Sequence, residues 1–96
     1  MAFNFFSKKP KGIERTPAQV AKFLDDFLNG TGKSWDWDDF ISTALADPEL
    51  EKIRKHCQKL DLEFPPEKPG QWCGPKGLEV IRGYADQLRA GAPVTN

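Results

Sequence analysis

The chain has 96 residues, a length that predicts one domain. Hydrophobic residues make up 39% of it and charged residues 29%, which is a globular composition rather than a disordered one. The formal net charge is zero, so charge alone gives no reason to expect binding to nucleic acid or to an anionic membrane. No stretch approaches the roughly 20 apolar residues of a membrane-spanning helix, which argues against integral membrane association.

The expected organisation is an N-terminal arm over residues 1–15, a single helical domain over 16–91 and a tail over 92–96. The arm combines three phenylalanines with lysines and shows no regular period. Such a segment suits either folding back on its own domain or docking elsewhere. Its apolar run is too short for a secretory signal peptide, so we expect a cytoplasmic protein whose two cysteines are free thiols.

The first predicted helix has the clearest boundaries. Thr16 can cap it, Pro17 suits its first position, and Gln19 completes a capping box. The dipeptide Asn29-Gly30 predicts its end, because glycine accepts the left-handed conformation that closes many helices. One apolar stripe follows the helical period and comprises Val20, Phe23, Leu24, Phe27 and Leu28.

Two further helices are predicted in the middle of the chain. The segment from Trp35 begins with a brief alternation but then spaces its apolar residues as a helix does, with Ser34 or Asp36 as the expected cap. The next helix begins cleanly, because Asp47 can cap it and Pro48 suits its first position. The apolar positions of these two helices are Trp37, Phe40, Ile41 and Ala44, and then Leu50, Ile53, Cys57 and Leu60.

Residues 61–74 hold three prolines and two glycines, which exclude a regular helix. Leu62, Phe64 and Trp72 predict a loop that packs on the domain, since a solvated linker would not usually carry such apolar bulk. Pro75 begins a last helix that ends near Gly91. The predicted fold class is therefore all-α: a small bundle of about four helices with a packed proline-rich loop.

The run from Gly30 to Ser34, Gly-Thr-Gly-Lys-Ser, is similar to the end of a phosphate-binding loop. The first glycine of such a loop would fall at Phe27, and the segment follows a helix where a nucleotide-binding fold requires a strand. A helix stop followed by a turn is the favoured interpretation.

The aspartates Asp36, Asp38 and Asp39 are hard oxygen ligands of the kind that divalent cations prefer. Their spacing does not match a calcium loop, because Phe40 and Ile41 stand where a ligand and a turn glycine are needed. Carboxylates in the first turn of a helix are also stabilised by its dipole, and this interpretation is favoured.

His56, Cys57 and Cys73 are three possible zinc ligands, but adjacent residues point in different directions on a helix and no fourth ligand follows at finger spacing. For the same reason His56 is poorly placed to act as the base for a Cys57 nucleophile, and Cys57 on the apolar stripe is expected in the core. No cofactor is predicted.

The tryptophans are the most informative residues, since tryptophan is frequent at binding hot spots and costly to leave in water. If Trp35 and Trp72 are exposed near Asp36, Asp38 and Asp39, they form an acidic, aromatic surface suited to a basic protein partner. Between residues 16 and 51 two lysines oppose eight acidic residues, which fits such a surface. The favoured alternative is that all three tryptophans fill the core.

The string Trp-Asp-Trp-Asp-Asp-Phe-Ile-Ser over residues 35–42, followed by Asp-Pro-Glu-Leu-Glu-Lys-Ile-Arg over 47–54, resembles a pattern in small uncharacterised bacterial proteins. The resemblance covers about a fifth of the chain. It implies a bacterial, cytoplasmic setting and brings no activity with it.

The leading functional hypothesis is a non-enzymatic interaction module that binds a protein partner through Trp35, Asp36, Asp38, Asp39 and Trp72. The alternative is a metal- or phosphate-dependent enzyme that uses the three aspartates and Lys33. An all-helical domain without a converging set of histidine, cysteine and buried carboxylate side chains favours the first hypothesis.

Overall fold

The computed structural model describes residues 12–33 and 35–91, and in these ranges it contains four helices and no strand. The helices are α2 (Pro17–Asn29), α3 (Asp36–Ser42), α4 (Pro48–Glu63) and α5 (Pro75–Ala90). The prediction of a small all-α bundle is therefore confirmed. None of these helices is long and apolar enough to cross a membrane.

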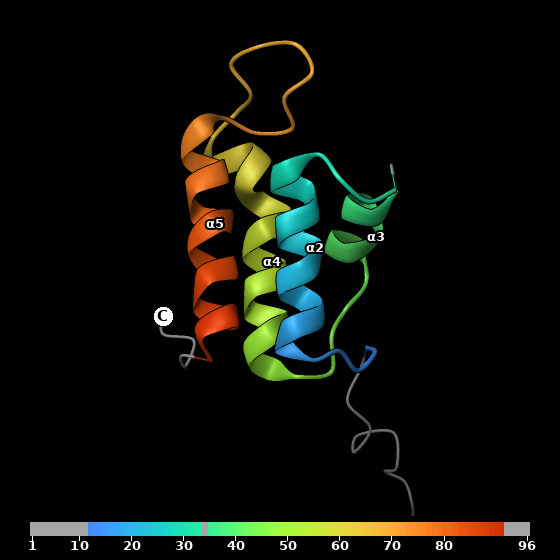
Figure 1. Cartoon of the computed structure of the whole chain (residues 1–96). Helices are drawn as coiled ribbons and strands as arrows, with labels where there is room; N and C mark the ends of the chain where they lie inside the picture. The colour runs from blue at the N-terminus through green and yellow to red at the C-terminus, as the bar shows by residue number, and fades with distance from the viewer. Residues whose placement is uncertain (1–11, 34, 92–96) are drawn as a thin grey trace, which may run out of the picture.

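Helices α2, α4 and α5 lie side by side as the body of the bundle, and the short α3 lies on the far side of α2 from α5 (Figure 1). The chain from α4 to α5 extends beyond one end of the bundle (Figure 1). Phe64 and Trp72, near the two ends of this loop, pack against the core, while residues 65–70 are exposed. Leu62 was expected to pack, but it is 78% exposed on the last turn of α4.

The caps of α2 and α4 are those predicted. The Thr16 hydroxyl accepts a hydrogen bond from the Gln19 amide, whose side chain accepts one from the Thr16 amide in return. Gly30 closes α2 with a φ of 70°. The Asp47 carboxylate accepts hydrogen bonds from the first amides of α4, those of Glu49 and Leu50.

Helix α3 begins differently from the prediction. Trp35 occupies its cap position in a helical conformation and makes no capping hydrogen bond through its side chain. Asp36 is not the cap, because it is already the first helical residue and its carboxylate accepts a hydrogen bond from the Lys33 amide at 2.8 Å. The other predicted cap, Ser34, lies outside the described residues.

The predicted apolar stripes meet in one core. Phe40 and Leu24, from α3 and α2, are fully buried there with Ile53 and Leu60 of α4 and Ile81 of α5. Burial of such side chains is the main favourable term in folding. It holds α3 against α2 and α4, although α3 has only seven residues.

A buried ion pair fixes the chain between α3 and α4. The Arg54 guanidinium donates to the Glu51 carboxylate at 2.5 Å and to the Ile41 carbonyl at 2.6 Å. The same carboxylate accepts a hydrogen bond from the Leu45 amide. Arg54 suits this position because its guanidinium fork reaches both the carboxylate and the backbone carbonyl.

Candidate interaction surface

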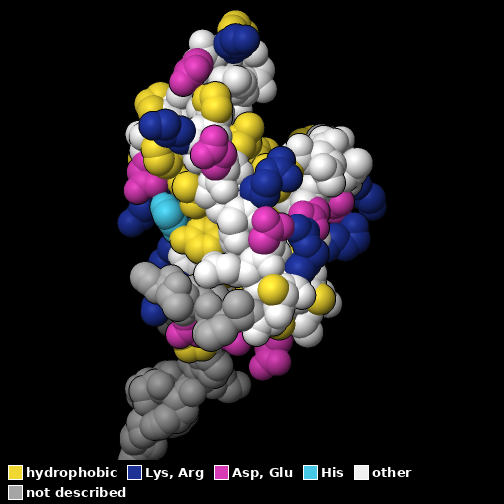
Figure 2. Space-filling view, turned by 60° about the vertical axis from the view of Figure 1, so that its left-hand side comes forward, with side chains coloured by type: hydrophobic (Ala, Val, Ile, Leu, Met, Phe, Trp, Pro, Cys, Tyr) yellow, Lys and Arg dark blue, Asp and Glu magenta, His cyan; other side chains and the backbone are white. Residues whose placement is uncertain are grey.

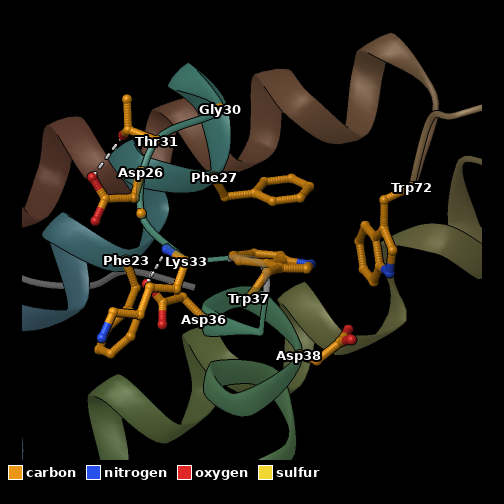
Figure 3. A pocket seen from close by; sticks show the side chains of 11 residues that line it. Phe23, Asp26, Phe27, Gly30, Thr31, Lys33, Asp36, Trp37, Asp38 and Trp72 are labelled. Atoms are coloured by element: carbon orange, nitrogen blue, oxygen red, sulfur yellow. Dashed lines mark hydrogen bonds between the residues drawn. The ribbon is translucent and has the colours of Figure 1, made fainter.

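A hollow of about 380 Å³ opens between the end of α2, the loop after it and the start of α3 (Figure 3). Aromatic rings and carboxylates from different parts of the chain meet there. Its lining comprises Phe23, Asp26, Phe27, Gly30, Thr31, Gly32, Lys33, Asp36, Trp37, Asp38 and Trp72. The site is therefore apolar on one side and acidic on another.

Three aromatic rings pack against one another in the hollow. Phe27 stacks on Trp37 with ring centroids 4.0 Å apart, and Trp72 stands at right angles to Trp37 with a centroid distance of 5.5 Å. The nitrogen end of the Trp37 ring points toward Trp72 (Figure 3). This indole nitrogen is buried and has no hydrogen-bond partner among the described residues.

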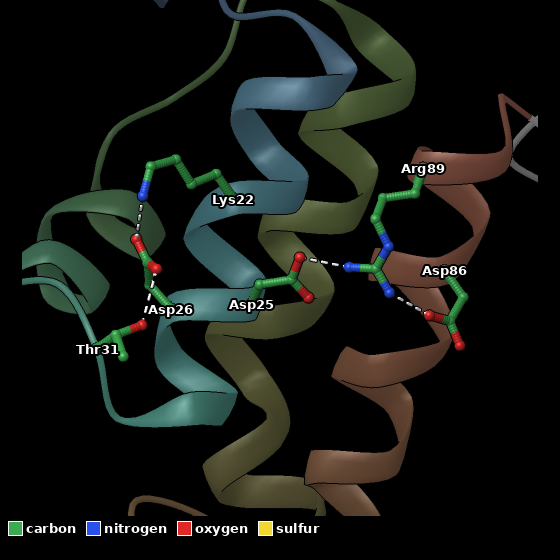
Figure 4. A network of polar contacts seen from close by, with 6 residues as sticks. All are labelled: Lys22, Asp25, Asp26, Thr31, Asp86 and Arg89. Carbon is green, nitrogen blue, oxygen red and sulfur yellow. Dashed lines mark hydrogen bonds and ion pairs between the residues drawn. The ribbon is translucent and has the colours of Figure 1, made fainter.

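The glycine-rich turn after α2 is held by its own hydrogen bonds. The Asp26 carboxylate accepts hydrogen bonds from the Lys22 ammonium and from the Thr31 hydroxyl, and these two contacts lower the pKa of Asp26 (Figure 4). The Lys33 amide is bonded to Asp36. A phosphate-binding loop needs such amides free to point at its ligand, so the turn matches a helix stop, as expected.

The predicted site residues fall into two neighbouring groups. Asp36, Asp38 and Trp72 line the hollow. Trp35 and Asp39 are exposed and do not line it. The expectation that all three tryptophans fill the core is correct for Trp37, which is 8% exposed, and wrong for Trp35, which is 74% exposed; Trp72 is half-buried.

Trp35 belongs to a continuous exposed stripe on α3. Trp35, Asp38, Asp39 and Ser42 are all exposed, and their spacing of three or four residues puts them on one side of the helix. We call this stripe the outer face of α3. It places a large aromatic side chain directly beside two carboxylates in solvent.

The chain's only histidine does not join a cysteine or a metal-type cluster. His56 lies between the Tyr84 hydroxyl, at 2.5 Å from Nδ1, and the Glu63 carboxylate, at 3.0 Å from Nε2. It therefore connects α4 to α5, and hydrophobic side chains lie next to it on the surface (Figure 2). Within residues 12–33 and 35–91, no three histidine, cysteine or acidic side chains gather as a metal site would require.

Both cysteines are buried free thiols. Burial raises the pKa of Cys57 to about 12, with a smaller contribution from Cys73, so this thiol is not the activated nucleophile that cysteine catalysis needs. The expectation that Cys57 is a core residue is confirmed.

Some residues of the site were not anticipated as such. Phe27 was assigned to the core, yet it is half-buried and lines the hollow. Asp26 was not singled out, although its position one turn after Lys22 and just before the Gly30 turn is the signal that would have indicated its two contacts.

Comparisons of the chain with known protein families, with curated proteins and with solved structures found no match. The functional argument therefore depends on the chain's own residues.

Proposed function

We propose that this protein is a non-enzymatic interaction module that binds a protein segment carrying both cationic and aromatic side chains. The binding surface consists of the outer face of α3 together with Asp36 and the half-buried Trp72 in the adjoining hollow. The observation that carries the proposal is Trp35, which is 74% exposed at the start of a helix whose first turn holds Asp36, Asp38 and Asp39.

An exposed tryptophan is unusual here, because every other aromatic side chain among residues 12–33 and 35–91 is at least partly buried. Leaving its rings in water forgoes the burial free energy of a large apolar side chain, whereas a partner that covers it recovers that energy. Tryptophan is accordingly enriched among the residues whose truncation weakens protein interfaces most.

The charges beside Trp35 select the partner. Asp36 lies near the cations Lys22 and Lys33, whereas Asp38 and Asp39 are exposed and form no ion pair with another described residue. A cationic segment is attracted to this surface and an acidic one is repelled, an effect that acts on specificity and association rate more than on affinity. An aromatic side chain on the same segment can cover Trp35 or enter the hollow beside Trp72.

The alternative, a metal- or phosphate-dependent enzyme, gains no support from the geometry. Asp36 is bonded to the Lys33 amide, and Asp38 and Asp39 point to solvent without a third converging ligand in the described ranges.

The test is fluorescence anisotropy with a short labelled peptide of alternating lysine and phenylalanine, compared with a peptide of alternating glutamate and phenylalanine. We expect the first to bind more tightly, with an affinity that falls as salt is added. Trp35→Ala should raise its Kd by roughly 30-fold, the equivalent of a hot-spot residue. Asp38→Asn combined with Asp39→Asn should remove the preference for the lysine peptide.

Two variants elsewhere serve as matched controls. Leu62→Ala removes another highly exposed apolar side chain, and Glu79→Gln neutralises an exposed carboxylate on α5. Neither should alter binding. Equal affinity for the two peptides, or equal binding by Trp35→Ala and Leu62→Ala, would reject the proposed surface.

A further inference from the structure

The chain carries a segment of the same chemistry as the proposed partner. Residues 1–11, Met-Ala-Phe-Asn-Phe-Phe-Ser-Lys-Lys-Pro-Lys, contain three phenylalanines followed by three lysines and no acidic residue. These residues lie outside those that the structure describes, so their sequence and the position of Gly12 are what the following argument uses.

The segment joins the domain directly beside α3. The Ile13 amide donates to the Ala44 carbonyl at 3.0 Å, and the Ala46 amide donates to the Ile13 carbonyl at 2.9 Å. Ala44 follows the last residue of α3 by two positions. Gly12 is held against this linker with a φ of 103°, so the chain leaves the domain at the Ser42 end of the outer face.

The segment is longer than that face, so it can reach along all of α3 without being fully extended. Helix α3, with seven residues, is about 10 Å long, and an extended chain advances about 3.3 Å per residue. Lys9 and Lys8 can thus lie about 10–13 Å from Gly12. Phe6 and Phe5 can lie about 20–23 Å away.

The order of side chains along the segment also matches the order along the face. A chain that leaves Gly12 and runs along α3 from the last residue of the helix to the first passes Asp39 and Asp38 before it reaches Trp35. The segment read in the same direction presents its lysines first and its phenylalanines afterwards. Opposite charges meet, and the phenylalanines reach the exposed indole.

We propose that residues 1–11 dock in cis on the outer face of α3, with the lysines against Asp38 and Asp39 and the phenylalanines against Trp35. The segment then competes with an external partner, so this inference rests on the surface of the proposed function. A tethered ligand acts at an effective concentration in the millimolar range, and even a weak contact is therefore populated.

Paramagnetic broadening in the full chain tests the docking. A nitroxide is attached at Ser7→Cys, since the native Cys57 and Cys73 are buried and do not compete for the label. We expect the amide signals of Trp35 and Asp39 to lose most of their intensity, and those of Glu79 and Arg82 on α5 to keep theirs.

Charge reversal separates docking from mere tethering. Lys8→Glu combined with Lys9→Glu, in the labelled chain, should restore the Trp35 signal, because the lysine contacts are lost while the tether is unchanged. An unrestored signal overturns the proposal. Broadening of an isotope-labelled chain by a separate nitroxide-labelled chain also overturns it, because the occupant is then a second copy.

Peptide binding distinguishes this inference from the proposed function. If the segment covers the face about nine-tenths of the time, the charge-reversed chain should bind the lysine and phenylalanine peptide about tenfold more tightly than the wild type. Equal affinities reject docking in cis and leave the proposed function standing. If residues 1–11 dock but neither the wild type nor the charge-reversed chain binds the peptide, the proposed function is rejected and docking in cis is not.

Discussion

Helices α3 and α4 are neighbours in sequence and space, but they are built by different means. Helix α4 has 16 residues and an aspartate cap, and it carries the Glu51–Arg54 pair that binds the preceding linker. Helix α3 has seven residues and no side-chain cap, and it is held by aromatic packing on its inner side. The comparison shows that α3 depends on its neighbours for its structure. The side chains of its outer face are therefore not needed to hold the helix in place.

Phe40→Ala should have the largest effect on this arrangement. The side chain is fully buried between α2 and α3 and stacks with Phe23. Its removal should lower the free energy of unfolding by about 3–5 kcal/mol, and chemical denaturation measures the loss.

Hydrogen exchange locates that loss. In Phe40→Ala the amides of α3 should exchange faster relative to those of α4, because α3 has no side-chain cap and depends on the packing of its buried side. A uniform increase over all four helices would mean that α3 unfolds only with the whole domain.

Glu51→Gln comes next, with a loss of about 1.5–3 kcal/mol, because the buried Arg54 guanidinium keeps its charge and loses its charged acceptor. The Arg54 contact lowers the pKa of Glu51 below its usual 4.5. The stabilisation is therefore complete above about pH 4.5 and is lost as the pH falls through the lowered pKa.

Denaturation of wild type and Glu51→Gln at several pH values tests the expected direction of this pH dependence. The difference between them should shrink as the solution becomes acidic. Glu49→Gln is the matched control, because this carboxylate is exposed and lies 3.9 Å from Lys52. A pH-independent difference for Glu51→Gln would contradict the assignment.

Asp47→Ala should cost about 1 kcal/mol, the usual effect of removing a helix cap. Asp38→Ala provides the comparison on α3, where the exposed carboxylate makes no capping bond. We expect a smaller change in thermal stability from Asp38→Ala than from Asp47→Ala. Equal losses would show that the dipole of even this short helix is important to stability.

The sequence predicted these two helices with unequal success, for a physical reason. Local signals determine α4, since Asp47 and Pro48 begin it and its apolar stripe runs from Leu50 to Leu60, about three turns. For α3 the expected cap was Ser34 or Asp36, and nothing local shows that the turn ahead of the helix uses the Asp36 carboxylate for the Lys33 amide.

Which of the tryptophans are exposed also depends on tertiary contacts that local sequence signals do not show. Trp35 and Trp37 are two residues apart and chemically identical, so helical spacing puts them on different sides without telling which side the core takes. Trp72 reaches the hollow from a loop that no periodic pattern describes. The pairing of Arg54 with Glu51 was missed because it also requires the Ile41 carbonyl, which only the folded linker brings near.

Of these two tryptophans, Trp35 gives the smallest predicted effect, and Trp37 provides the contrast. Trp35→Ala should change the free energy of unfolding by no more than about 0.5 kcal/mol, since the side chain is 74% exposed. Trp37→Ala, which removes a ring stacked on Phe27, should cost about 3–5 kcal/mol. Thermal and chemical denaturation of the two variants measure the contrast. A large loss in Trp35→Ala would mean that this side chain stabilises the fold, and the reason for assigning it to a partner would disappear.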